Sequence, residues 1–226
     1  MKATFLKISL IVSTLVLFFA VSAMALPVAG QFITLSVDNA IGGANNGGEF
    51  TATVRDEHGD SNIYRTFCLE SQVTFLPEKE YKIESVTDAL TNKDGTVFGN
   101  KLKDETKWVF WNYINGTLLD NSTGDIVVRN QYNSAVVQWK IWELEEQSLA
   151  PIVSNLTTTY SSIYNDWTQG VDSFAINGIV KVLNIYDGNT RAQSQLVGAP
   201  VPEPTTLLLF GTGLLGLAGI ARRRKS

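Results

Sequence analysis

Apolar and polar positions alternate through the first part of the chain. The segments 33–37 and 50–54 repeat every second residue, a period that predicts two half-buried strands. The glycine- and asparagine-rich segment 42–48 between them is typical of a flexible turn or loop. Further strands are expected over 63–70 and around Tyr81 and Ile83. The pattern therefore predicts a β-rich first half.

The hydrophobic period changes after Asp104, which is placed to cap a short helix. A stronger helix is predicted from about Asn130 to Gln147, with one apolar stripe at helical spacing and further apolar positions on its flank. The stripe consists of Tyr132, Ala135, Val136, Trp139 and Trp142, and the flank of Val137, Ile141 and Leu144. Because so much of its surface is apolar, this helix is expected at the centre of a domain.

The last part of the central chain returns to strand-like alternation. It covers 174–186, after which 187–200 becomes polar and is interpreted as an approach to the C-terminal segment. Together the patterns predict an α+β fold: a single β-rich domain with one or two central helices. The intervening length, residues 26–200, is enough for one domain with a substantial core.

The N-terminus carries the features of an export signal. Lys2 and Lys7 precede an apolar run over 8–21, and Ala23-Met24-Ala25 matches a small-residue cleavage site. Residues 1–25 are therefore interpreted as a secretory signal peptide. A retained N-terminal helix is the alternative, and the cleavage site argues against it.

The C-terminus is an uncharged segment between two markers. Val201, Pro202, Glu203 and Pro204 precede the segment 205–221, and four basic residues follow it: Arg222, Arg223, Arg224 and Lys225. As a helix the segment spans about 26 Å, slightly less than a hydrocarbon core of about 30 Å. The basic residues would keep that end in the cytoplasm. An ordinary membrane anchor would share these properties.

The order of these parts closely resembles the PEP-CTERM sorting signal, which covers 201–226. The resemblance implies recognition by exosortase, a membrane protease-transpeptidase of Gram-negative bacteria that make extracellular polysaccharide. It also implies a transient inner-membrane intermediate with a transmembrane helix, and delivery to the cell surface or the extracellular matrix. The remaining domain, 26–200, is then exported.

The net charge of that domain excludes one class of binding partner. The two ends hold six of the 18 basic residues and one of the 22 acidic residues, so 26–200 carries 12 cations and 21 anions. Such an acidic domain is repelled by phosphate backbones, so nucleic-acid binding is not expected. His58, the one histidine, lies in a polar turn, and no metal site of ordinary zinc-ligand spacing is expected. No cofactor is predicted.

The single cysteine, Cys68, is unusual in an exported protein, where cysteines are normally paired. One interpretation is a buried, inert thiol. The other is a sulfur already bonded to something else. Gln138 is a candidate partner, because it lies among large apolar residues in the predicted central helix. A buried amide is costly unless it is hydrogen-bonded. Gln138 is therefore either a satisfied structural residue or the acyl group of an internal thioester, formed when a thiol attacks the amide and expels ammonia.

These residues resemble the Cys–Gln thioester domain of bacterial surface adhesins. The similarity rests on Phe67-Cys68-Leu69-Glu70 and on Gln138-Trp139-Lys140-Ile141-Trp142, and it implies a thioester between Cys68 and Gln138. Two positions depart from the family pattern: Val137 replaces a threonine and Lys140 replaces an alanine. Lys140 is two positions from Gln138 and so points to a different helix face.

Three functions follow from these patterns. The first is an exported, adhesin-like module that attaches once, without turnover, to an amine or hydroxyl on a surface or on extracellular polysaccharide. The second is a carbohydrate- or matrix-binding structural module without a thioester, in which the five tryptophans could stack on sugars if exposed. The third, an exported hydrolase with an acidic pair, is the least favoured, and no enzyme with catalytic residues is expected.

Overall fold

The computed structural model describes residues 25–37, 47–147 and 154–201. The predicted signal peptide and the predicted transmembrane sorting helix lie outside these ranges. Ala25–Ala199 forms one compact unit, an α+β domain with a mainly antiparallel sheet and, within the described ranges, three helices. No helix in this part of the chain is both long and apolar enough to cross a membrane.

Seven strands form the main sheet, in the order β10-β9-β4-β1-β2-β3, with β11 also paired to β9. Their bounds are β1 Phe32–Ser36, β2 Glu49–Arg55, β3 Ser61–Phe67, β4 Glu80–Thr87, β9 Gly178–Asp187, β10 Thr190–Arg191 and β11 Gln195–Pro200. Two small hairpins complete the described strands: β5 Ala89–Thr91 with β6 Val97–Lys101, and β7 Leu119–Asp120 with β8 Asp125–Ile126. The alternation predicted over 33–37, 50–54 and 81–83 is confirmed by buried inward positions in β1, β2 and β4.

The main sheet closes on itself at one point. Cys68, the first residue after β3, forms an isolated antiparallel bridge with Gln195, the first residue of β11. Since β11 also pairs with β9, the strand pairings run around a ring. The adjacent Leu69 N–H donates to the Ser194 carbonyl at 2.9 Å. Cys68 therefore lies at the seam of this ring.

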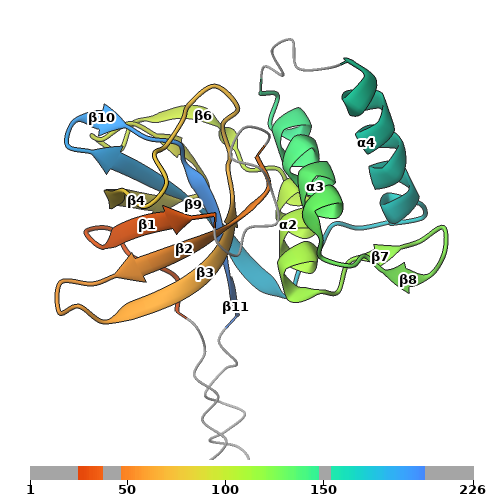
Figure 1. Ribbon diagram of the computed structural model, residues 1–226, viewed down its shortest axis with the longest axis horizontal. Coiled ribbons are helices and arrows are strands. Elements are labelled where there is room, and N and C mark those ends of the chain that lie inside the picture. Colours follow the sequence, from red (N-terminus) through yellow and green to blue (C-terminus); the bar gives the residue numbers. More distant parts are fainter. Residues whose placement is uncertain (1–24, 38–46, 148–153, 202–226) are drawn as a thin grey trace, which may run out of the picture. The chain divides into compact units, whose positions relative to one another are not determined.

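Three helices stack beside the sheet: α2 Asp104–Asn115, α3 Gln131–Leu144 and α4 Ser154–Thr168 (Figure 1). Helix α3 begins as predicted, because the Asn130 side chain accepts a hydrogen bond from the Asn133 N–H at 2.8 Å. The predicted cap of α2 is wrong. Lys103 occupies the N-cap position without a side-chain cap, and Asp104 is the first helical residue, where its carboxylate pairs with Lys107 at 2.8 Å.

Two hydrophobic clusters fill the domain. One lies within the main sheet and includes Ile33, Val54 and Ile185. The other lies between the sheet and the helices and includes Phe67, Val137 and others from α2, α3, α4, β3 and β9. The helix α3 is thus central, as predicted, and it faces the sheet directly.

Several sequence-based predictions need correction. The buried face of α3 is Ser134, Val136, Val137, Gln138, Trp139 and Ile141, whereas Tyr132 of the predicted stripe is half exposed. The segment predicted as a strand over 63–70 pairs with β2 only to Phe67. The strand expected over 174–186 begins at Gly178. The polar segment 187–200 is not an approach to the tail: it supplies β10 and β11 to the main sheet.

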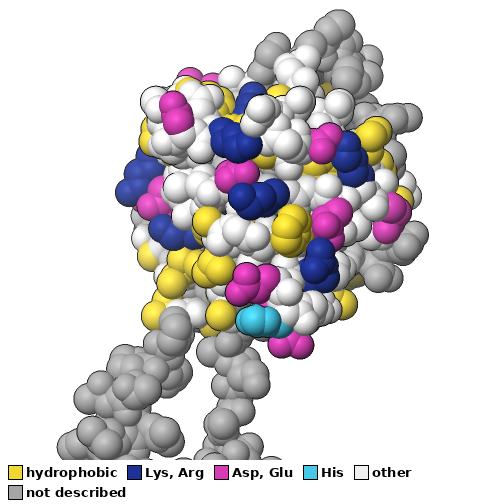
Figure 2. Space-filling view, turned by 90° about the vertical axis from the view of Figure 1, so that its left-hand side faces the viewer, with side chains coloured by type: hydrophobic (Ala, Val, Ile, Leu, Met, Phe, Trp, Pro, Cys, Tyr) yellow, Lys and Arg dark blue, Asp and Glu magenta, His cyan; other side chains and the backbone are white. Residues whose placement is uncertain are grey.

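Acidic and basic side chains are intermixed on the side of the domain opposite the helices, with the histidine near the bottom of the view (Figure 2). Charged side chains of the sheet form ion pairs: Arg55 of β2 pairs with Glu80 of β4 at 2.8 Å, and Lys82 pairs with Glu84 within β4 at 3.4 Å. The acidic excess is therefore not gathered into one patch on this face.

Candidate functional site

Gln138 fills the point at which strands β2 and β3 separate. The pairing of the two strands ends at Glu49 and Phe67. Gly48, directly before β2, and Cys68, directly after β3, are therefore the first positions not paired between these strands. The Gln138 side chain reaches between them from α3 and is fully buried. The burial predicted for this glutamine is confirmed, and the structure brings it together with Cys68.

Three hydrogen bonds hold the Gln138 amide. Its Oε1 accepts from the Cys68 N–H at 3.0 Å and from the Gly48 N–H at 3.3 Å. Its Nε2 donates to the Cys68 carbonyl at 2.7 Å. A backbone N–H can only donate and a carbonyl can only accept, so these partners fix which end of the amide is oxygen. The side chain therefore continues the ladder between the strands as a short strand would.

This arrangement has the geometry of an oxyanion site. If a nucleophile added to the amide carbon, negative charge would develop on Oε1, where two backbone N–H groups already point. Donors fixed in this way in a water-excluded site stabilise such a charge strongly. The amide is also held against the backbone of the one residue that carries a thiol, which provides the proximity the reaction needs.

Gly47 permits this close approach. Its φ is +71°, and a Cβ built on it would lie 2.5 Å from Cγ of Gln138 and 2.8 Å from the Trp142 ring. Only glycine fits both the backbone conformation and the space. The loop that the sequence marks as flexible thus ends in a pair of glycines with separate roles, since Gly47 makes room for Gln138 and Gly48 supplies a donor.

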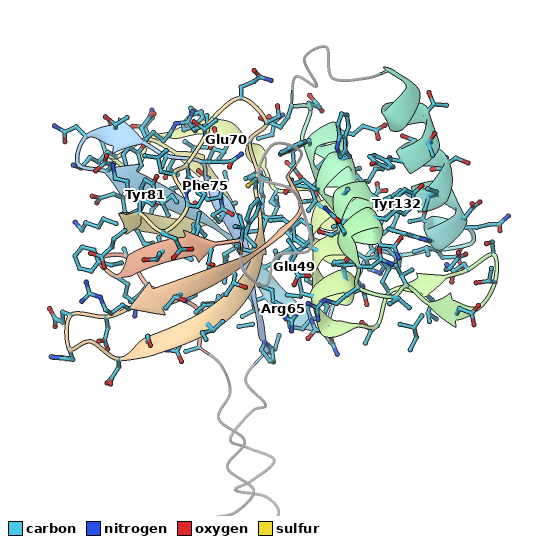
Figure 3. All side chains as sticks on the ribbon, in the orientation of Figure 1. Glu49, Arg65, Glu70, Phe75, Tyr81 and Tyr132 are labelled. Atoms are coloured by element: carbon cyan, nitrogen blue, oxygen red, sulfur yellow. The ribbon has the colours of Figure 1, made fainter. Side chains whose placement is uncertain are left out.

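The start of β2 is anchored to the same helix. The Glu49 N–H donates to Ser134 Oγ at 2.6 Å. The buried Glu49 carboxylate pairs with Arg65 and Arg129, where the sheet meets the helices (Figure 3). Desolvation by burial raises the pKa of Glu49, and the hydrogen bond from Arg129 opposes that shift. These contacts hold Gly48, the neighbouring residue, in register with Gln138.

The Cys68 thiol is almost completely buried, with 2% of the residue exposed. Burial raises its pKa to about 12; a hydrogen bond from Gln195 lowers it and the charge of Glu70 raises it. The sulfur is therefore a neutral thiol at ordinary pH. Gln195 Nε2 lies 3.6 Å from Sγ and donates to it.

Glu70 and its partners border the thiol. The carboxylate of Glu70, which is also buried, pairs with Arg191 and accepts from the Ser194 N–H at 3.1 Å. The Gln193 side chain donates to the Glu70 carbonyl. The polar segment before the tail therefore packs directly around the cysteine.

A cavity of about 320 Å³ opens beside Cys68. Its described lining comprises Val37, Gly47, Phe50, Cys68, Ser71, Val73, Thr74, Phe75, Pro77, Trp142 and Gln193. Phe50 and Phe75 meet edge to face at 5.2 Å between ring centroids. Trp142 Nε1 is buried and has no hydrogen-bond partner among the described residues. The described residues that line this cavity carry no charge, and the cavity reaches Cys68.

The other residues considered in the sequence lie away from this site. Lys140 turns toward α4, where its Nζ lies 4.7 Å from the Tyr164 ring centroid and pairs with Glu143 at 3.2 Å. His58 is exposed in a turn, with its Nε2 3.7 Å from Glu57. Val201 is half exposed, and the rest of the sorting motif and the basic cluster 222–225 lie outside the described residues.

The site residues that the sequence did not reveal are Gly47, Gly48, Ser134 and Thr66, whose hydroxyl lies 3.2 Å from Gln195 Oε1. Gly48 acts through its backbone, so no side chain marks it. Gln195 had a signal: it lies in the run Gln193-Ser194-Gln195-Leu196, where two amides alternate with a hydroxyl directly before an apolar strand. Alternation of this kind is typical of a strand, even where the inward positions are polar.

Comparison with known proteins identifies the C-terminal segment. Residues 200–225 match the PEP-CTERM protein-sorting motif, and this motif implies export and processing by exosortase. Comparison with curated proteins gives no match. Among solved structures, the chain is similar to the N-terminal thioester domain of a surface protein from Clostridium perfringens, with 11% identity, 74% of this chain and 97% of that chain covered, and a TM-score of 0.45.

Proposed function

We propose that the chain is an exosortase-sorted protein of the cell surface or extracellular matrix in which Cys68 and Gln138 condense to an internal thioester. The thioester is a latent electrophile for an amine or hydroxyl on a target surface or on extracellular polysaccharide. It reacts once, with no turnover and no cofactor, so the protein is an attachment module rather than an enzyme. The match to the sorting motif supports this location.

The observation that carries the proposal is the placement of the Gln138 amide. Three hydrogen bonds hold it to Cys68 and Gly48, and its oxygen faces two N–H donors. In the condensation, Cys68 Sγ bonds to Gln138 Cδ, the thiol proton passes to the amide nitrogen, and the C–N bond breaks to release ammonia. In attachment, the target nucleophile bonds to Cδ, the C–S bond breaks, and the nucleophile's proton restores the Cys68 thiol.

Burial supports the same reaction. Both residues are shielded from bulk water, which would otherwise hydrolyse a thioester, while the cavity beside Cys68 admits a small reacting group. Because the buried Cys68 thiol is neutral, it attacks as a weak nucleophile. The two N–H donors at the Gln138 oxygen are therefore the main groups that promote the attack.

The alternatives have less support. Trp111, Trp139 and Trp167 are each at most 7% exposed, so these rings belong to the core and offer no open platform for sugars. For a hydrolase, the two buried carboxylates near the site, Glu49 and Glu70, are both paired with arginines. Neither is placed as a free acid or base.

Intact-mass spectrometry of the exported protein tests the proposal. The protein should be one ammonia lighter than its sequence, and Cys68→Ala and Gln138→Ala should each restore the full mass expected for the variant. The same spectrum reports the cleavage of the C-terminal segment. Fragmentation should locate the cross-link between Cys68 and Gln138.

Thiol reactivity provides the second measurement. Under denaturing conditions that preserve a thioester, a thiol reagent should leave wild-type Cys68 unmodified until methylamine is added, and should modify Gln138→Ala at once. Full mass together with immediate modification of the wild-type thiol would overturn the thioester. Those results would favour a structural module.

A further inference from the structure

Cys68 meets a second buried glutamine, and this one contacts the sulfur itself. Gln195 is fully buried, and its Nε2 lies 3.6 Å from Cys68 Sγ. The two residues form the bridge that closes the sheet. The bond from Leu69 N–H to the Ser194 carbonyl, one residue along each chain, makes Cys68 and Gln195 a non-hydrogen-bonded pair. Side chains approach most closely in such pairs.

The partners of Gln195 fix the direction of its amide. Nε2 lies 3.0 Å from the Gln193 carbonyl oxygen, which can only accept a hydrogen bond. The NH₂ group therefore occupies this side, and Oε1 faces the Thr66 hydroxyl at 3.2 Å. The sulfur consequently lies beside a donor. Two side-chain amides therefore contact Cys68. The Gln138 amide has its oxygen between two backbone donors, and the Gln195 amide has its nitrogen beside the sulfur.

A purely structural role would not require this orientation. The space beside a thiol is filled at lower cost by an apolar side chain, since a thiol is a weak hydrogen-bonding group and a buried amide must be satisfied at every atom. A donor at sulfur becomes valuable when the sulfur carries negative charge. That charge develops twice in the proposed reaction: when the thiol attacks Gln138, and when the target nucleophile displaces the sulfur.

We propose that Gln195 is a catalytic residue of the thioester centre, whose N–H stabilises the charge on Cys68 Sγ during thioester formation and during release of the sulfur. This rests on the proposed function. When the nucleophile has bonded to Gln138 Cδ, the electrons of the breaking C–S bond pass to Sγ beside this N–H. The proton of the nucleophile then neutralises the sulfur. Gln195 neither gains nor loses a bond.

The test measures how fast methylamine opens the thioester in the exported protein. Two variants remove the donor: Gln195→Leu, which is apolar and branched, and Gln195→Met, which is apolar and keeps the unbranched length of the side chain. The reaction should slow by about ten- to a hundred-fold, the effect expected for a hydrogen bond to a charged group. The control is Asn184→Ala, which removes another fully buried amide that bonds to Thr87, Ala89 and Thr91 and accepts from the Ser194 hydroxyl at 3.4 Å, but does not bond to Cys68 or Gln195.

A second readout separates a charge effect from looser packing. With a weakly basic amine such as trifluoroethylamine, breaking the C–S bond limits the rate, because the attacking amine is expelled easily. Loss of the donor should therefore slow trifluoroethylamine more than methylamine. Looser packing would change both rates alike, and in Asn184→Ala both should stay within about twofold of wild type.

The outcomes are distinct. If the wild-type protein has its full mass, no thioester has formed, and the proposed function itself is overturned. Wild-type protein with a thioester, and Gln195 variants that open at the wild-type rate with both amines, would overturn only the role of Gln195. Variants that fold, judged by circular dichroism, but form little thioester support that role, because formation passes through the same charged sulfur.

Discussion

Gln138 and Gln195 are both fully buried glutamines that contact Cys68, one at its backbone and the other at its sulfur. Gln138 arrives from helix α3 and bonds to the backbone of Cys68, with its oxygen between two N–H donors. Gln195 arrives from strand β11 and bonds to the sulfur through its nitrogen, with its oxygen facing one hydroxyl. The identity of the residue is therefore no guide to its role, whereas the direction of its amide is.

The opposite directions of the two amides match the places where negative charge develops in the proposed reaction. Negative charge moves onto the Gln138 oxygen when the sulfur attacks and onto the sulfur when it departs. Each position already has N–H donors directed at it, two at the oxygen and one at the sulfur. Donors placed before the reaction need no reorganisation during it. The comparison predicts that disturbing the helix side prevents thioester formation, whereas disturbing the strand side slows both the formation and the opening of the thioester.

The largest expected effect on this comparison comes from Gly47→Ala. The added Cβ would lie 2.5 Å from Gln138 Cγ on a residue whose φ is +71°, so the amide must move away from Cys68. We expect a loss of about 2–4 kcal/mol in the free energy of unfolding and a thioester in only a minority of molecules. Urea unfolding and intact mass measure the two effects.

Gly170→Ala is the matched control. Its φ is +74°, close to that of Gly47, and no atom lies within 4 Å of the added Cβ. It should therefore lose stability from backbone strain alone while forming the thioester fully. Equal thioester yields in the two variants would contradict the claim that Gly47 positions Gln138.

The pH dependence of stability should give an intermediate effect. Gln138→Ala leaves Cys68 as a free thiol. In the wild-type fold, desolvation raises the pKa of this thiol from 9.0 to about 12, and the variant should retain a raised pKa if Cys68 stays buried. A raised pKa stabilises the fold below the unfolded value and loses that contribution as the pH rises toward the folded value. Above about pH 9 the free energy of unfolding should fall by about 1.4 kcal/mol per pH unit beyond the fall shared with other variants.

The reference for that measurement is the double variant Cys68→Ala/Gln138→Ala, which shares every other titrating group. Urea unfolding of both from about pH 8 to 10.5 isolates the thiol. Parallel curves would mean that the thiol is not held neutral by burial. Wild-type protein with a complete thioester has no thiol to titrate, so its curve should follow the double variant.

The sequence predicted the helices and strands whose buried residues are apolar. Alternation marked β1, β2 and β4, and helical spacing marked α3. Helix α4 was missed because Ser154–Thr168 is rich in serine, threonine and asparagine, which have low helix propensity, so packing must stabilise it. The hydrophobic pattern did not mark strand β11, because Gln193, Ser194 and Gln195 are polar yet buried, and their hydrogen-bond partners are distant in sequence.

The candidate site divides in the same way. The buried state of Gln138 was predictable from its apolar neighbours, and its proximity to Cys68 from the resemblance to thioester domains. The two donors at its oxygen were not predictable, because they are backbone N–H groups whose direction depends on where β2 and β3 separate. The contact between Gln195 and the sulfur depends on closure of the sheet, a pairing between residues 127 positions apart.

The smallest effect is expected from Thr66→Val, which acts only on the strand side. The Thr66 hydroxyl lies 2.6 Å from the Leu196 carbonyl and 3.2 Å from Gln195 Oε1, and one proton can serve only one of them. Valine keeps the shape and removes this donor, which should cost about 1–3 kcal/mol of stability. The thioester should still form completely. Its opening by methylamine should slow by only about two- to fivefold, because the Gln193 carbonyl still holds the Gln195 nitrogen beside the sulfur. A slowing as large as that of Gln195→Leu would contradict this ranking and would assign the direction of the amide to Thr66 instead of Gln193.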